Sequence, residues 1–285
     1  MTRVSEAEAT DDVVEAELSL VSTVASALVV GLALVLTARA GATALLVAVA
    51  GVQAVLAAAW VFGTSMPGRK GALVIAVLAA GGADVAASVW PHGKLGTLLA
   101  VLGLAVPAMF IHQLTRGAAR VQVVSSMAAV AFLVLAEVSL PALLQLRHEF
   151  GASDSGGKVT AAAAAALAGA LVIGCLVDLL LPAPRFDPAV PRGLLALIAS
   201  AGLGGSLGYL MLRQQNDFVD GRSVFIGGAL GALAGLLAVG AAFVLHSTPP
   251  PPGSAARWLR PVLSAVLPIV LLAPVAFLLC LAIRA

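Results

Sequence analysis

The chain has 285 residues, of which 61% are hydrophobic and 11% are charged, whereas soluble domains carry roughly 25% charged residues. This composition excludes a water-soluble globule, and a net charge of +2 gives no reason to expect a nucleic acid partner. Cys175 and Cys280 lie in apolar runs without the spacing of a redox or metal site. We therefore expect no metal and no other cofactor.

The amino end is an acidic tail, residues 1–17, which lacks the basic start of a secretory signal peptide. The first apolar run should therefore be retained as a membrane span. Each apolar run is long enough to cross a bilayer, which takes about 20 residues. Nine runs follow one another, at 20–37, 41–63, 71–90, 95–114, 121–146, 159–181, 191–212, 223–246 and 262–284.

The runs predict an all-α bundle of about nine transmembrane helices. Helices satisfy their own backbone hydrogen bonds in hydrocarbon, and the runs lack the alternation of barrel strands. Most separators are short and contain Pro, Gly and charged residues, which is typical of turns between antiparallel neighbours. A composition rich in Ala, Gly and Arg is typical of a GC-rich bacterial genome, and we expect a location in the cell membrane.

Two longer separators, 147–158 and 247–261, suggest how the chain is divided. The second contains Pro249 to Pro252, which predicts an extended polyproline spacer or, alternatively, a docking ligand. The predicted parts are the acidic tail 1–17, an eight-helix body 18–246, a Pro-rich loop 247–261 and a ninth helix 262–285.

The distribution of Lys and Arg predicts the orientation. With the amino end in the cytoplasm, nine Lys and Arg residues fall on the inner side and seven on the outer side. Positive residues accumulate on the cytoplasmic side of membrane proteins. We therefore predict a cytoplasmic amino end and an external carboxyl end.

Asp84 and Glu137 are the deepest ionisable residues in the apolar runs. A charged group within a membrane span is costly and marks a functional site by default. Pro141 cannot donate to the carbonyl of Glu137, so that a carboxyl and a freed carbonyl coincide at one level. Two adjacent carboxyls in a low dielectric cannot both ionise cheaply, so at least one should hold a proton near neutral pH. A proton relay needs a group with this property. Acids that hold helices together by hydrogen bonds are the alternative.

Three further acids are weaker candidates. Asp178 lies near the end of its run, where we expect it to meet water or an arginine such as Arg185. Asp217 and Asp220 lie in the polar segment 213–222, which could hold a cation or a lipid headgroup, although a solvated hairpin explains the same residues.

Glycines predict a close contact between the seventh and eighth spans. Small residues on facing helices allow backbones to approach each other. The residues concerned are Gly204, Gly208, Gly227, Gly231 and Gly235.

These features favour a proton-coupled transporter or permease of a small molecule or ion. The alternative is a non-catalytic assembly or scaffold subunit that binds a membrane protein partner through its acidic tail and proline spacer. A lipid-modifying enzyme is the third interpretation, and the lack of a polar catalytic cluster in the sequence counts against it. In every case the lipid bilayer is the immediate partner.

Overall fold

The computed structural model describes residues 2–66, 68–91, 94–116, 122–151, 154–181, 183–187, 190–213, 218, 220–247 and 255–284. Within these ranges, nine helices are long and apolar enough to cross a bilayer. The predicted all-α membrane bundle is therefore confirmed, and the chain is a multi-pass membrane protein.

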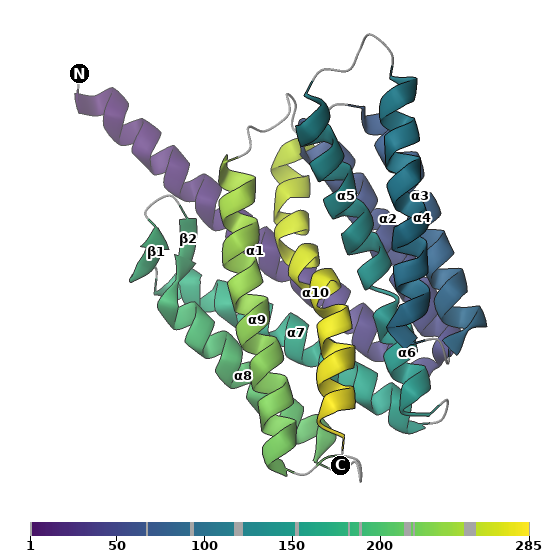
Figure 1. Cartoon of the computed structure of the whole chain (residues 1–285). Helices are drawn as coiled ribbons and strands as arrows, with labels where there is room; N and C mark the ends of the chain where they lie inside the picture. The colour runs from purple at the N-terminus through teal and green to yellow at the C-terminus, as the bar shows by residue number, and fades with distance from the viewer. Residues whose placement is uncertain are drawn as a thin grey trace.

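The chain forms ten helices and one short hairpin within its described part (Figure 1). The hairpin pairs β1 (Arg185–Asp187) with β2 (Val190–Gly193) in antiparallel fashion between the seventh and eighth helices. The helices are α1 (Thr2–Ala40), α2 (Ala42–Gly63), α3 (Arg69–Val89), α4 (Lys94–Thr115), α5 (Val123–Ser139), α6 (Ala142–Glu149), α7 (Asp154–Leu180), α8 (Leu194–Leu212), α9 (Asp220–Ser247) and α10 (Ala255–Ala282).

Helix α10 lies in the middle of the molecule (Figure 1). It packs against α1, α7 and α9 on one side and against α2, α5 and α6 on the other. Val266, Ile269 and Val270 in its middle are 0% exposed, and Phe277 nearer its carboxyl end is 1% exposed. The ninth span therefore shares one core with the spans before it.

The connection before α10 is shorter than predicted. The helix begins at Ala255, inside the segment 247–261 that the sequence indicated as a loop. Pro261 lies within the helix, where the lost hydrogen bond is tolerated because neighbouring helices re-satisfy the backbone. Pro249 to Pro252 lie outside the described residues, so the spacer remains a prediction.

The fifth span is interrupted in the middle. Helix α5 ends at Ser139 and α6 begins at Ala142, with Leu140 and Pro141 between them in a turn. Proline has no backbone N–H and its ring clashes with the preceding turn, which breaks the helix at this point. The interruption lies inside the bundle, because Leu140 is fully buried.

The predicted separator at 147–158 is wrong at both ends, because α6 continues to Glu149 and α7 begins at Asp154. At the first end the reason is Arg147, which the sequence placed in the loop. It is only 6% exposed and donates from Nη1 to the carbonyl oxygen of Ala38 at the end of α1. A buried arginine that satisfies the last turn of another helix holds this segment inside the fold.

The seventh span also begins later than its predicted bounds, 191–212. Residues up to Gly193 are extended, and α8 begins at Leu194. Pro191 cannot supply a helical N–H, and the N–H of Gly193 is used elsewhere, on the Asp178 carboxylate at 2.8 Å.

Helices α8 and α9 make backbone contact along their glycines. A Cβ atom added at Gly204 would lie 2.4 Å from the carbonyl oxygen of Gly227, and one added at Gly231 would lie 2.3 Å from that of Ser200. Only glycine allows so close an approach. All of the glycines singled out in the sequence face the opposite helix, namely Gly204, Gly208, Gly227, Gly231 and Gly235.

Candidate functional site

Gln53 lies in the middle of α2 and links it to the interrupted fifth span. Its side chain is 2% exposed, and its Nε2 donates to the carbonyl oxygen of Glu137 at 2.9 Å. This is the carbonyl that Pro141 leaves without a helical donor. The sequence predicted the freed carbonyl but not its partner, because a neutral glutamine in an apolar run carries no charge to draw attention to it.

The Glu137 carboxyl is enclosed and has no hydrogen-bonding partner in the part of the chain that the structure describes. The residue is 0% exposed, and neither Oε1 nor Oε2 accepts a hydrogen bond from any described residue. A buried polar group without a partner is destabilising. Such a group persists where it serves a ligand, a proton or a bound water.

Asp84 on α3 completes the group. It is 9% exposed, and its carboxyl lies near enough to the Gln53 side chain to interact with it. Its charge interacts with that of Glu137, so the structure brings the two acids together. We call Gln53, Asp84 and Glu137 the carboxyl cluster.

Gln53 and Glu137 lie deep in the bundle, whereas Asp84 is five residues from the end of α3 at Val89. Gln53 is ten residues from the carboxyl end of α2, which corresponds to about 15 Å at the helical rise. Glu137 lies a similar distance inside its span, which ends at Glu149. Gly81, one turn before Asp84 on α3, faces open space, with no described atom within 4 Å of the position that a Cβ atom would occupy.

A cavity of about 630 Å³ opens at one end of the bundle, between α2, α5 and α9. We call it the vestibule. Its polar lining includes Ser65, Ser125 and Ser247, and Trp60 and Phe132 form part of its wall. Their rings are in contact, tilted by 32° with centroids 5.2 Å apart.

Trp60 connects the vestibule with the carboxyl cluster along α2. It lies seven residues after Gln53, on the same face and about 10 Å farther along the axis. Its Nε1 is buried and has no hydrogen-bonding partner among the described residues. The Trp60 and Phe132 rings therefore form the part of the vestibule wall that lies along α2 toward the carboxyl cluster.

A second cavity, of about 450 Å³, lies between α3 and α4 and is almost wholly apolar. Gly82 and Ala86 line it, and helical periodicity places Asp84 on the opposite face of α3. Near this cavity Gln145 donates to Thr97 at 2.7 Å. This cavity is separate from the carboxyl cluster.

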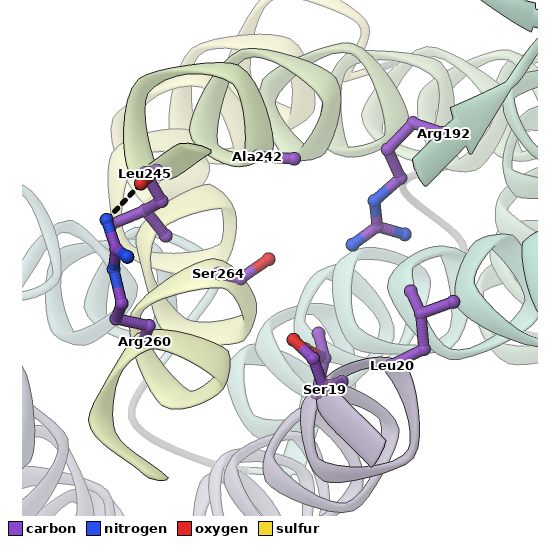
Figure 2. A pocket seen from close by; sticks show the side chains of 8 residues that line it. Ser19, Leu20, Arg192, Ala242, Leu245, Arg260 and Ser264 are labelled. Carbon is purple, nitrogen blue, oxygen red and sulfur yellow. Dashed lines mark hydrogen bonds between the residues drawn. The ribbon is translucent and has the colours of Figure 1, made fainter. Parts of the chain in front are cut away.

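Asp178 is a paired structural acid at the end of α7. Its Oδ2 lies 3.2 Å from Nη1 of Arg192, and both side chains are buried. The ion-pair partner is Arg192, because the hairpin turns this side chain inward (Figure 2), and the charge of Arg185 also acts on the Asp178 carboxylate. Desolvation acts to lower the pKa of the Arg192 guanidinium, but Cys175 and Asp178 raise it by more.

The side chains of the other two weaker candidates lie outside the part of the chain that the structure describes. Asp217 is not described, and of Asp220 only the backbone, at the start of α9, is described. Among the described residues, no group of three His, Cys, Asp or Glu side chains could hold a metal ion.

The chain matches no protein family, and no curated protein or solved structure is significantly similar to it. Its function therefore has to be argued from the site.

Proposed function

We propose that this protein moves a small solute or ion across the membrane, and that the movement is coupled to protonation of the carboxyl cluster. The observation that carries the proposal is Glu137, a fully buried acid whose two carboxyl oxygens have no partner among the described residues. It lies beside a broken helix and a second acid, Asp84. Buried acids at membrane depth are typical of ion and proton pathways.

The chemistry of such a site follows from the cost of buried charge. Two carboxyls that share a water-poor site favour a state with at least one proton, because adjacent negative charges repel and are poorly solvated. A cation or a cationic group that enters the site could replace this proton. Gln53 holds the backbone of Glu137 in place during the exchange and lies next to the Asp84 side chain.

The broken span supplies a point at which the structure could open. Transporters place their sites at discontinuous helices, where unwound backbone lines the site. Here the break at Leu140 and Pro141 directly follows the turn that contains Glu137. Movement of α6 relative to α5 would expose the carboxyl, and displacement of Trp60 and Phe132 would open it toward the vestibule.

The experiment is a flux assay in liposomes that enclose a pH-sensitive dye. The outer solution is made more acidic than the vesicle interior. One of four additions is then made outside: Na⁺, K⁺, a mixture of common amino acids or a mixture of sugars. We expect at least one addition to change the internal pH faster than in protein-free vesicles. Glu137→Gln and Asp84→Asn keep the volume of the acids and their ability to form hydrogen bonds but cannot titrate, so they should abolish this response.

Asp154→Asn is the matched control, because Asp154 is an exposed acid whose partner, Lys158, is also at the surface. It should leave the response unchanged. A response of Glu137→Gln equal to that of the parent would refute the role of the cluster. A protein that changes no internal pH but retains a copurifying membrane partner in mild detergent would instead support the scaffold alternative.

A further inference from the structure

The two acids of the carboxyl cluster differ in their distance from the surface of the protein. Helix α3, which carries Asp84, lies at the edge of the bundle beside α4 (Figure 1). Asp84 is 9% exposed, whereas Glu137 is 0% exposed. The five residues between Asp84 and the end of α3 at Val89 correspond to about 7 Å along the axis. Asp84 is therefore the acid nearer to the surface.

Two small residues leave room beside Asp84 on α3. Gly81 lies one turn before it and Ser88 one turn after it, and both are exposed. No described atom lies within 4 Å of the position of a Cβ atom at Gly81. Val85, the next residue of the chain, is 57% exposed, so this side of α3 faces the lipid. Asp84 thus borders on the lipid-facing surface.

Trp90 marks the level of the membrane surface at this end of α3. It directly follows the helix and is 60% exposed, and tryptophan is enriched at the headgroup level of bilayers. Ser88 lies between Trp90 and Asp84, and its hydroxyl donates to the backbone carbonyl oxygen of Asp84. Polar groups therefore follow one another from the headgroup level to the Asp84 carboxyl, which gives water a short approach.

On the vestibule side, apolar side chains close the carboxyl cluster. Leu56 and Ala57 follow Gln53 on the same face of α2, toward the vestibule, and are 0% and 3% exposed. Leu133 and Val134 occupy the corresponding stretch of α5 and are 0% and 1% exposed. None of these side chains can carry a proton, so the route from the vestibule is closed in this structure.

The charged groups of the helices packed against α3 belong to the cluster or lie elsewhere. Helices α2 and α5 contribute only Glu137. On α4, His112 lies against Gly71 near the opposite end of α3, and on α6, Arg147 donates to the end of α1. The Lys94 side chain lies outside the described part of the chain. The remaining titratable residues lie at the ends of α3 and α6, namely Arg69, Lys70, His148 and Glu149.

We propose that Asp84 is the acid through which the carboxyl cluster takes up its proton, from the side of the membrane at which α3 ends. Glu137 then receives the proton from Asp84. This inference rests on the proposed function, because it assigns roles within the same site. A proton from the headgroup layer binds to the Asp84 carboxylate. It passes to the Glu137 carboxylate, since Oδ1 of Asp84 and both carboxyl oxygens of Glu137 have no partner among the described residues.

The first test compares how fast the two acids react with dicyclohexylcarbodiimide, an apolar reagent that modifies protonated carboxyls within a membrane. The full-length protein is reconstituted and treated, and the modified acids are located by mass spectrometry of its fragments. We expect Asp84 to react about tenfold faster than Glu137 or more, because the reagent reaches Glu137 only after local opening of the bundle. Equal or faster modification of Glu137, or no modification of Asp84, would overturn the proposal.

Two variants test the approach to Asp84. Gly81→Leu fills the open space beside the carboxyl, and Ser88→Leu covers it from the headgroup side. Each should slow the modification of Asp84 by about tenfold. Since Ser88 is exposed, Ser88→Leu tests the approach even if Gly81→Leu does not fold. Gly240→Leu is the matched control, because Gly240 also has no atom within 4 Å of its Cβ position but lies on α9.

The flux assay in liposomes separates this inference from the proposed function. In an active protein, Gly81→Leu and Ser88→Leu should slow the change of internal pH, whereas Gly240→Leu should not. If the parent responds but both variants match Gly240→Leu in modification and in flux, the inference is overturned and the proposed function stands. If the parent itself changes no internal pH after any of the four additions, the proposed function is refuted and the inference falls with it.

Discussion

Replacing Gly227 with alanine tests the closest helix contact in the structure. A Cβ atom at this position would lie 2.1 Å from the carbonyl oxygen of Gly204, whereas real Cβ atoms essentially never approach within 3.0 Å. Helices α8 and α9 would therefore have to separate by about 1 Å, and the glycines along the contact would lose their packing. Overpacking of this kind costs about 1 to 3 kcal/mol.

Gly240 on the same helix provides a matched control. No atom lies within 4 Å of the Cβ position there, so Gly240→Ala adds only the better helix propensity of alanine, about 1 kcal/mol. We expect the free energies of unfolding of the two variants to differ by about 2 to 4 kcal/mol, with Gly227→Ala the less stable.

The assay is unfolding in mixed micelles by increasing fractions of sodium dodecyl sulfate, followed by circular dichroism. Gly227→Ala should unfold at a lower fraction than the parent, and Gly240→Ala at an equal or higher one. Unfolding of both variants at the same fraction would show that α8 and α9 do not make this backbone contact, and the argument from small residues would be refuted.

Two further predictions concern the carboxyl cluster and the orientation. Gln53→Leu should lower the free energy of unfolding in the same assay by about 1 to 3 kcal/mol, because the Glu137 carbonyl loses its donor; an unchanged transition would contradict this. For the orientation, a membrane-impermeant maleimide applied to intact cells should label Asp154→Cys but not Ser65→Cys, with little background because Cys175 and Cys280 are buried. The reverse pattern would place the amino end outside, and labelling of both would contradict the three spans between them.

Much of this architecture could be predicted from the sequence, because hydrocarbon allows few solutions. Spans of about 20 apolar residues must be helices, and this determined the number of crossings. Because proline has no backbone N–H, the sequence also showed that Pro141 leaves the carbonyl of Glu137 without its helical donor. The glycine spacing indicated which helices approach most closely, since only residues without a Cβ atom allow backbone contact.

The lateral arrangement of the helices was decided only by the tertiary structure. Gln53 and Glu137 are 84 residues apart, and Arg147 and Ala38 are 109 apart. No local pattern joins such pairs. In a soluble protein the polar face of a helix would show which side points outward. In a membrane both lipid and core favour apolar side chains, so periodicity does not distinguish the two faces, and packing alone decides which polar residues meet.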